Sequence, residues 1–382
     1  MADVELLEGV ARVPRDEWNA LVGDESPFLE WDWLAALEES GAVGGDTGWL
    51  PRPLAARRDG RLVAACPRYV KAHSEGEFVF DWSWADAAER AGIAYYPKLL
   101  VGVPFTPVAG ARFLVAAGED RAAWLARLAG ALRELCLANE LSGVHVNFCR
   151  EEELEPARRA GFLVRIGVQY HWSNAGYASF DDYLARLRSK RRNQIRRERR
   201  ALAEQGLSVE VLRGEAIDPG LAEPLHRLYR ATVDKHVWGR PYLNRAFFER
   251  LLSHFRERLC LLLARRGGQL VAGTLNVQKG DALYGRYWGC LRELPHLHFN
   301  LCYYAAIEHC IASGLARFEP GAGGDYKHVR GFDAQPTWSL HYLAEPRLAR
   351  AVERFLDAER SQAHDAIGWL RQRSAYKDGP LR

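Results

Sequence analysis

The chain has 382 residues and a mass of 43.1 kDa, more than twice the usual single-domain size, so we expect two domains or one fold built twice. Hydrophobic residues make up 48% and charged residues 26%, which excludes a mainly disordered, collagen-like or coiled-coil chain. A net charge of +3 from 52 basic and 49 acidic residues excludes a polycation that coats nucleic acid or anionic lipid. Any basic partner site must therefore be local.

An internal repeat is the strongest signal along the chain. AARRDGRLVAA (55–65) returns as LARRGGQLVAG (263–273) at an offset of 208, and each copy predicts two antiparallel strands around a glycine turn. Three more pieces recur in the same order: PFLEWDWLAAL (27–37) with PYLNRAFFERL (241–251), Tyr95-Tyr96 with Tyr303-Tyr304, and FTPVAG (105–110) with FEPGAG (318–323). The pattern predicts a duplication in which each copy runs helix, antiparallel strands, helix, and a strand ending in a Pro/Gly-rich loop.

The segments outside the repeats predict the boundary between the copies. Residues 151–172 read as a helix followed by a strand, and residues 177–206 read as one long helix closed by Gly206. We therefore expect an N-terminal domain over 1–173 and a C-terminal domain over 174–382 that includes a basic helix over 181–205. After the second copy, TWSLHYL (337–343) predicts a strand and Pro346 opens a terminal helix.

Several common chemistries lack their usual sequence signals. The seven cysteines are odd in number and form no CxxC pair, which argues against a zinc site and a disulfide framework and favours the reducing cytoplasm. The start MADVELLEGV does not resemble a signal peptide, and apolar runs such as LCLLLA (259–264) are too short to span a bilayer. The motifs GxSxG, HExxH, GxxxxGK[ST] and GxGxxG are absent, so we expect neither a hydrolase nor a redox enzyme, and no metal.

The order of elements is the one expected of the GNAT acyltransferase fold, and six long motifs sharpen the match. They are KAHSEGEFVFDWSWA (71–85), YYPKLLVGVPFTPVAGARFL (95–114), SKRRNQIRRERR (189–200), LYGRYWG (283–289), LHFNLCYYAAIEHCI (297–311) and EPGAGGDYKHVRGF (319–332). The chain resembles the FemAB-like predicted N-acyltransferases of peptidoglycan biosynthesis or recognition, from about Pro27 to Phe355. The resemblance implies an α/β fold, a tandem duplication of GNAT-like domains with mixed, largely antiparallel sheets, and transfer of an acyl or aminoacyl group to an amine.

The acyl donor stays open between an aminoacyl-tRNA and an acyl-CoA. The [QR]xxGx[GA] loop that holds the acyl-CoA pyrophosphate in ordinary GNAT enzymes is missing, which favours tRNA or another bulky donor. Residues 186–200 hold nine basic residues and one acid, so this helix is either a solvated arm or a phosphate-binding face. The phosphate-binding candidates are Lys190, Arg191, Arg192 and Arg196.

Acyl transfer to an amine needs a neutral nucleophile, donors toward the developing oxyanion and a closed pocket. Lys327 and Arg330 follow the Gly-rich loop, and the resemblance implies that a Lys in this region stabilises the carbonyl oxygen, although Val329 stands where the broader Fem pattern has that Lys. Glu319 is a candidate proton acceptor, with His298, His328 and His341 as alternatives.

Aromatic segments at 78–86 and 283–289 are expected on equivalent strands of the two copies. Their polar members would be costly to bury without partners, which favours a groove that recognises the amine acceptor, while packing alone is the other interpretation. The substrate-binding candidates are Asp81, Trp82, Trp84, Asp86, Tyr95, Tyr96, Lys98, Arg286, Tyr287, Trp288, His298 and Tyr304.

Three functions remain open at this level: an N-acyltransferase acting on a small-molecule or peptide amine, a non-catalytic recognition module for an amino-bearing ligand, and an acetyl-CoA-dependent N-acetyltransferase. We expect no covalently bound cofactor, and tRNA is a candidate partner. The sequence does not indicate an oligomeric state.

Overall fold

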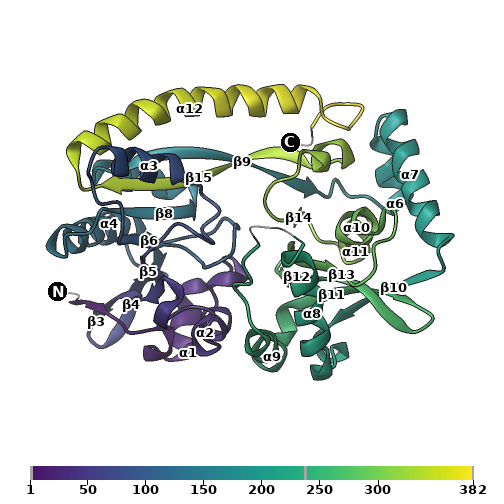
Figure 1. Cartoon of the computed structure of the whole chain (residues 1–382), viewed down its shortest axis with the longest axis horizontal. Coiled ribbons are helices and arrows are strands. Elements are labelled where there is room, and N and C mark those ends of the chain that lie inside the picture. The colour runs from purple at the N-terminus through teal and green to yellow at the C-terminus, as the bar shows by residue number, and fades with distance from the viewer. Residues whose placement is uncertain (1–2, 236–238, 381–382) are drawn as a thin grey trace. The chain divides into compact units, whose positions relative to one another are not determined.

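The computed structural model describes residues 3–235 and 239–380, which form two compact units (Figure 1). Unit 1 takes the chain up to Gly167 and adds Pro336–Asp365, and unit 2 takes Val168–Gln335 and adds the chain from Ala366 onward. The first crossing lies close to the predicted boundary at residue 173. The division differs from the predicted one because residues 336–365 belong to unit 1, so the chain returns to its first unit near its end.

The strands of unit 1 form two sheets. In one sheet β1 pairs with β3, β3 with β4, and β4 with β7; in the other, β2 pairs with β5, β5 with β6, β6 with β8, and β8 with β15. The strands are β1 (Asp3–Leu6), β2 (Trp49–Pro51), β3 (Leu54–Arg58), β4 (Arg61–Cys66), β5 (Arg68–Lys71), β6 (Lys98–Val101), β7 (Leu114–Val115), β8 (Gly143–Cys149) and β15 (Asp333–Leu343).

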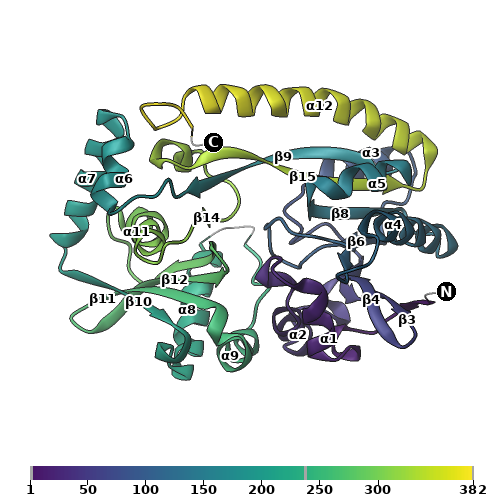
Figure 2. The same ribbon diagram turned by 180° about the vertical axis from the view of Figure 1, so that it is seen from behind.

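Unit 2 carries a sheet with the order β10-β11-β12-β13-β14-β9 (Figure 2). All neighbours are antiparallel except β13 and β14, which are parallel. The strands are β9 (Leu163–Ser173), β10 (Leu207–Arg213), β11 (Leu259–Arg266), β12 (Gln269–Lys279), β13 (Ala282–Cys290) and β14 (Arg317–Glu319).

The two units repeat one pattern of strand pairing. The hairpin β3–β4 pairs Ala55 with Ala65, and β11–β12 pairs Leu263 with Gly273, which is the same register after the offset of 208. The register shifts at the equivalent step in both hairpins, after Ala56 and after Ala264. Because each unit then continues through an antiparallel, a parallel and an antiparallel pair, the fold is a tandem duplication of GNAT-like domains.

The last strand of each unit comes from a distant part of the chain. In unit 1, β8 pairs with β15, which follows all the strands of unit 2 in sequence. In unit 2, β14 pairs with β9, which follows the strands β1 to β8 of unit 1. Each unit thus completes its sheet with a strand that follows the other copy in the sequence. This exchange explains why residues 336–365 return to unit 1.

Two of the four sequence repeats do not correspond in the structure. Tyr95-Tyr96 lies in an extended segment before β6, whereas Tyr303-Tyr304 lies in a helical turn. FTPVAG follows β6, whereas FEPGAG begins in β14, whose pairing makes it the counterpart of β8. The expectation that residues 78–86 form a strand is also wrong, because Trp82–Arg90 is a helix whose start follows a loop.

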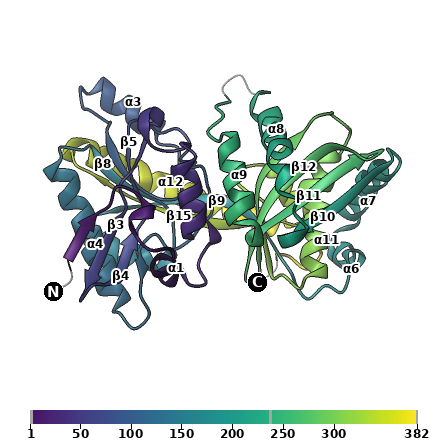
Figure 3. The same ribbon diagram turned by 90° about the horizontal axis from the view of Figure 1, so that it is seen from below.

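Helices cover the sheet of unit 2 on both faces, with α8 and α9 on one side of β11–β12 and α11 on the other (Figure 3). In unit 1, Leu128 and Leu132 of α4 pack against Leu99 of β6 and Val144 of β8. The helices are α1 (Arg15–Val22), α2 (Trp31–Glu39), α3 (Trp82–Arg90), α4 (Arg121–Ala138), α5 (Leu154–Arg159), α6 (Phe180–Arg186), α7 (Ser189–Ala203), α8 (Ala222–Val233), α9 (Arg245–His254), α10 (Leu297–Phe299), α11 (Ala305–Ala312) and α12 (Pro346–Gln372). Within the described residues, none of these helices is long and apolar enough to cross a membrane.

The basic segment is two helices rather than the predicted single helix. The chain breaks between α6 and α7, where Leu187 is buried in an extended conformation. Leu187 bridges to Tyr376, and the Arg188 amide donates to the carbonyl oxygen of Ala375. These contacts with the C-terminal segment keep α6 and α7 as two separate helices.

Candidate functional site

The candidate site of unit 2 lies where its two parallel strands part. Strand β13 pairs with β14 only over Ala282–Tyr284 and then continues to Cys290, while the chain after β14 turns into the Gly-rich loop 320–332. At Gly285 of β13 an added Cβ would lie 3.2 Å from the Cα atom of Pro320. Glycine at this position therefore lets the loop lie directly against the strand.

Lys327 projects its amine into this loop. Its side chain is 2% exposed, and Nζ donates to the carbonyl oxygens of Gly321 at 2.6 Å and Ala322 at 3.1 Å. No carboxylate is paired with Lys327 among the described residues. Burial lowers the pKa of Lys327 to about 8. The amine is thus a positioned cation near neutral pH that loses its charge under mildly basic conditions.

A ring of half-buried and buried aromatic groups surrounds His298, near Lys327. The His298 ring lies 5.2 Å from Trp288 and 5.4 Å from Tyr303, measured between ring centroids. Burial, together with the positive charges of Lys327 and Arg330, lowers the pKa of His298 to about 4. His298 is therefore neutral at pH 7 and can act as a hydrogen-bonding group but not as a cation.

Glu319 ends β14 at the mouth of the same loop. Its Oε1 atom is 3.0 Å from Nε of Arg317, and its Oε2 atom is 3.8 Å from Nε2 of His171 on β9. Oε2 is buried and has no hydrogen-bond partner among the described residues. Burial lowers the pKa of His171, and Arg317 and Lys327 act in the same direction while Glu319 opposes it. Glu319 thus holds a free acceptor oxygen beside a neutral imidazole.

Arg330 is held by a buried network. Its Nε donates to the Tyr304 hydroxyl at 2.8 Å, one terminal nitrogen donates to the carbonyl of Tyr326, and the other donates to both carboxylate oxygens of Glu198. The guanidinium also lies 3.6 Å from the centroid of the Phe299 ring. Every side-chain nitrogen of Arg330 has a partner. Arg330 therefore links Glu198 of α7 to the Gly-rich loop 320–332.

The basic residues of α7 divide into two groups. Arg191 and Arg192 are half-buried and donate to groups of their own segment, Gln194, Leu187 and Ser189. The half-buried Arg199 pairs with Glu308 at 2.9 Å. The outward group is Lys190, Arg196, Arg197 and Arg200, which together with Asn193 line a hollow of about 510 Å³. The candidate phosphate-binding face is therefore shifted toward Arg197 and Arg200, which follow Asn193 by about one and two helical turns.

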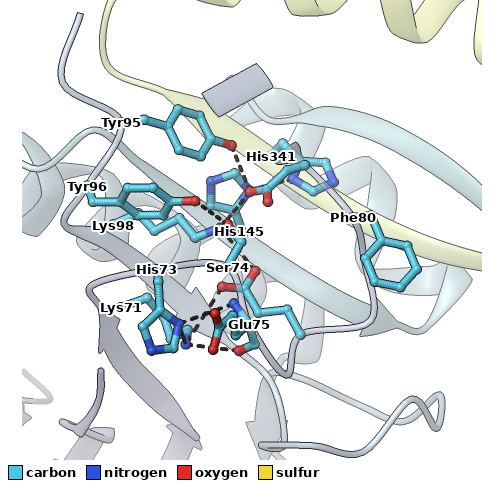
Figure 4. Close-up of polar contacts among 12 residues, drawn as sticks. Lys71, His73, Ser74, Glu75, Phe80, Tyr95, Tyr96, Lys98, His145 and His341 are labelled. Carbon is cyan, nitrogen blue, oxygen red and sulfur yellow. Dashed lines mark hydrogen bonds and ion pairs between the residues drawn. The ribbon is translucent and has the colours of Figure 1, made fainter. Parts of the chain in front are cut away.

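Unit 1 contains a second cluster, in which charged groups are fully buried (Figure 4). Lys98, at the start of β6, is 0% exposed, and its Nζ lies 2.5 Å from Asp81, 3.0 Å from Glu77 and 2.8 Å from the Ser74 hydroxyl. Tyr95 donates to the same Asp81 oxygen at 2.7 Å. Although burial opposes the charge, Glu77 and Asp81 raise the pKa of Lys98 and Lys98 lowers that of Asp81, so this pair is ionised.

Lys71 and Glu77 are the members of the unit 1 cluster whose pKa values lie near neutral pH. Lys71 Nζ lies 4.0 Å from Glu77 and 3.7 Å from the centroid of the Trp49 ring, and it donates to the carbonyl of Glu75. Burial lowers the pKa of Lys71 to about 7 and raises that of Glu77 to about 7. Lys71 and Glu77 therefore each gain or lose a proton near neutral pH.

Two histidines extend the unit 1 cluster across neighbouring strands. Nδ1 of His145 on β8 lies 2.7 Å from Nδ1 of His341 on β15, and Nε2 of His341 lies 2.9 Å from the Ser339 hydroxyl. Burial lowers the pKa of both rings, that of His145 to about 3, so one ring donates and the other accepts. Nε2 of His145, Oδ1 of Asp81 and Oε1 of Glu77 have no hydrogen-bond partner among the described residues. Each of these three atoms therefore lacks the hydrogen-bond partner that a buried polar atom normally has.

The paired strands show which residues of unit 2 stand at the same positions. Lys71 opposes Lys98 across β5–β6, and its repeat partner Lys279 opposes Ala282 across β12–β13, so Ala282 corresponds to Lys98. Continuing across the parallel pair, Leu100 opposes His145 and Tyr284 opposes Glu319. The pair His145–His341 of unit 1 thus corresponds to Glu319–His171 of unit 2. Since unit 2 adopts this pairing without the Lys98 ion pairs, the fold does not require them.

The structure brings some of the predicted residues together and separates others. In unit 1, Asp81, Tyr95, Tyr96 and Lys98 share one cluster, and in unit 2 Lys327, Arg330, His298, Trp288 and Tyr304 lie around one loop.

The remaining predicted residues have other surroundings, although Trp84 contacts the unit 1 cluster through His341. Trp82 is 55% exposed on α3, where Asp86 is also exposed, and Trp84 packs against His341 and under Arg165. Tyr287 packs on Tyr229, with the Arg286 guanidinium over its ring.

Other members of the two sites were not identified from sequence. Lys71 carries a weak signal because it is one of only seven lysines in a chain with 45 arginines. The others, which carry no local signal, are Glu77, His145, His171 and Glu198. Within residues 3–235 and 239–380, no three His, Cys, Asp or Glu side chains lie close enough together to hold a metal ion.

Comparison with known proteins agrees with this architecture. The FemAB_like family, described as peptidoglycan biosynthesis/recognition, matches residues 9–378. Among solved structures, FemX is 14% identical with a TM-score of 0.55, covering 91% of this chain and 100% of its own. L-PGS from Bacillus licheniformis is 9% identical with a TM-score of 0.50, covering 84% of this chain and 95% of its own. A tandem GNAT protein from the clavulanic acid biosynthesis pathway is 14% identical with a TM-score of 0.46, covering 91% and 99%. No curated protein matches the sequence significantly.

The fold and the site define a tandem GNAT-like acyltransferase. Because the family match extends over nearly the whole chain, this protein belongs to the FemAB_like family.

Proposed function

We propose that this acyltransferase moves an aminoacyl group from an aminoacyl-tRNA to an amine of a peptidoglycan precursor. The observation that carries the reaction is the buried, carbonyl-bound amine of Lys327 at the point where β13 and β14 diverge. A buried, fixed cation stabilises the negative charge that develops on the carbonyl oxygen in acyl transfer. The family description supports the peptidoglycan acceptor.

The segment after β13 favours a tRNA ester over an acyl-CoA thioester. A pyrophosphate loop at this place needs glycines and free amides at a helix N-terminus. Here residues 291–296 read LRELPH and contain Glu293 and Pro295 but no glycine. The outward basic face of α7 supplies the alternative anion-binding surface, which suits the phosphates of a nucleic acid.

The transfer step follows from the charges of the loop. The neutral amine of the acceptor attacks the ester carbonyl carbon, and Lys327 stabilises the resulting oxyanion. Glu319, with its free Oε2 atom, receives the proton that the amine loses. Collapse of the intermediate breaks the carbon–oxygen bond to the ribose, and Glu319 returns the proton to that oxygen as it leaves, so an amide and a deacylated tRNA are formed.

In unit 1, the buried cluster is a candidate recognition site for a polar ligand. Oδ1 of Asp81 and Oε1 of Glu77 accept hydrogen bonds, and Nε2 of His145 accepts or donates one according to its tautomer. A polar ligand with several donors, such as an amine or a sugar hydroxyl group, satisfies these atoms.

The test is a mass-spectrometric transfer assay. The chain is incubated with a charged tRNA pool and a lysine-containing muropeptide, and in parallel with a set of acyl-CoA donors. We expect the muropeptide to gain the mass of one aminoacyl residue only with charged tRNA, and Lys327→Ala to reduce this product. Product formed only from acyl-CoA would contradict the proposed donor, and tRNA deacylation without a modified muropeptide would contradict the proposed acceptor.

A further inference from the structure

A second basic hollow lies on unit 2. It has a volume of about 500 Å³ and lies between α8, the β11–β12 turn and the segment after β13. Three arginines from these three elements contribute its charge: Arg227, Arg266 and Arg292. The rest of the lining is mainly apolar and consists of Pro224, Leu270, Val271 and Leu291, with Gln269 beside them.

The three arginines are not engaged elsewhere. In the part of the chain that the structure describes, none of their guanidinium groups has a hydrogen-bond or ion-pair partner. Among residues 3–235 and 239–380, no acidic residue lines the hollow.

The acids on the same elements are all bound to other cations. Glu223 pairs with Arg245 at 3.4 Å, Asp234 with Arg230 at 3.1 Å, and Glu293 with Lys235 at 2.8 Å. Three like charges around one hollow repel each other, and that repulsion is relieved when an anion binds between them.

The duplicated unit gives an internal control for this arrangement. The first arginine of each hairpin turn has an equivalent glutamate partner in the two units. Arg57 pairs with Glu5 at 3.1 Å, and Arg265 pairs with Glu210 at 2.6 Å.

The second arginine of the turn differs between the units. Arg58 pairs with Glu119 at 2.7 Å, whereas its counterpart Arg266 lines the hollow and its side chain has no partner within the described part of the chain. The fold can therefore place an acidic partner beside this arginine, as Glu119 shows in unit 1. Among the described residues, unit 2 has no such partner for Arg266.

We infer that this hollow, here called the arginine hollow, binds a small soluble phosphate ester with a short apolar group. Guanidinium groups match phosphate oxygens through paired N–H donors. The phosphate lies among Arg227, Arg266 and Arg292, and the organic group lies on Leu270 and Leu291. The arginine hollow is a separate site from the Lys327 loop, and its occupation does not depend on the transfer reaction.

Isothermal titration calorimetry with inorganic phosphate, butyl phosphate and butanol tests the site. The wild-type chain is expected to bind butyl phosphate more tightly than inorganic phosphate and not to bind butanol. The double variant Arg266→Glu/Arg292→Glu is expected to bind butyl phosphate at least ~10-fold more weakly, since it loses two charge-assisted contacts and gains two repulsive ones.

Arg213→Glu is the matched control, because Arg213 is an exposed arginine of unit 2 outside the hollow. Equal loss of binding in Arg213→Glu would overturn the site, as would no saturable binding by the wild type. Melting temperatures of both variants identify any loss of folding. Sedimentation with phosphatidic acid vesicles separates the two sources of phosphate: cosedimentation that requires Arg266 and Arg292, without butyl phosphate binding, would overturn the soluble ester. Because these measurements need no acyl donor, they leave the proposed transfer reaction untouched if they fail.

Discussion

The two units share a strand register but bury different chemistry at the same positions. Unit 1 has the Lys98 ion pairs and the pair His145–His341 at and beside its parallel strands β6 and β8, whereas unit 2 has Ala282 and the pair Glu319–His171 at the equivalent places. A difference between equivalent positions of one duplicated fold cannot arise from the demands of that fold. The Lys98 ion pairs of unit 1 are therefore not a requirement of the shared strand pairing.

The largest expected effect comes from removing the buried charge of Lys98 in unit 1. Lys98→Met leaves Asp81 and Glu77 buried without their main cation, and removing one partner of a buried pair costs about 3 to 5 kcal/mol. We expect urea unfolding to show a loss of this size.

Lys279→Met is the control for the Lys98 variant, because Lys279 lies in the corresponding strand pair of unit 2, where it is only half-buried. It should cost less than about 1 kcal/mol. Equal losses in the two variants would show that the units do not differ in this way.

The next effect concerns the reaction. Removing one oxyanion donor lowers turnover by about 100- to 1,000-fold, so Lys327→Ala should lower turnover by this factor while the far-UV circular dichroism stays unchanged. Arg330→Ala is expected to act differently, since it leaves Glu198 buried and unpaired and should lower the melting temperature. Wild-type turnover in Lys327→Ala would remove the loop from the mechanism.

The pH dependence of stability gives a smaller effect with a definite sign. The pKa of Lys327 falls from its ordinary value of 10.5 to about 8 on folding, so charging this amine opposes the folded state. Its cost is fully present below pH 8 and disappears between pH 8 and 10.5, so this contribution makes the protein more stable as pH rises through that window.

Lys327→Met removes that contribution. At pH 7 it should raise the free energy of unfolding by roughly 1 to 3 kcal/mol, and the gain should vanish near pH 10.5. Unfolding curves at pH 7, 9 and 10.5 test this, and a gain that does not change with pH would contradict the buried charge.

The smallest effect tests the equivalence of the units. Arg57→Ala and Arg265→Ala each remove a partly exposed pair with a glutamate at the same register position. Each should cost about 0.2 to 1 kcal/mol. The Arg57 variant should cost slightly more, because Arg57 also pairs with Glu17 at 2.8 Å. Differential scanning calorimetry resolves the two, and a large loss in only one unit would argue against equivalent hairpins.

Local patterns predicted the hairpins and helices well, and long-range pairing explains what they missed. The hairpins at 55–65 and 263–273 follow from alternation and glycine turns, which act within a few residues. The exchange of β9 and β15 depends on pairing between segments far apart in the sequence, so no local signal marks it. The break at Leu187 likewise depends on contact with Tyr376.

The candidate site was predicted only in part for the same reason. Lys327 follows a glycine-rich loop in a recognisable motif, and Lys98 stands out in an Arg-rich chain. His145 and His171 lie in strands that read as ordinary buried segments, and their importance comes from the strands beside them. Glu198 looked like the one acid of a solvated helix, yet it is buried against Arg330.

The pH profile of turnover in the wild type and in Lys327→Arg tests the central claim most directly, namely that a charged Lys327 stabilises the oxyanion. The wild type should lose turnover as pH rises through about 8, because Lys327 then loses its proton. An arginine keeps its charge throughout this range, so Lys327→Arg should retain reduced activity without that decline. The same decline near pH 8 in both proteins would contradict the account.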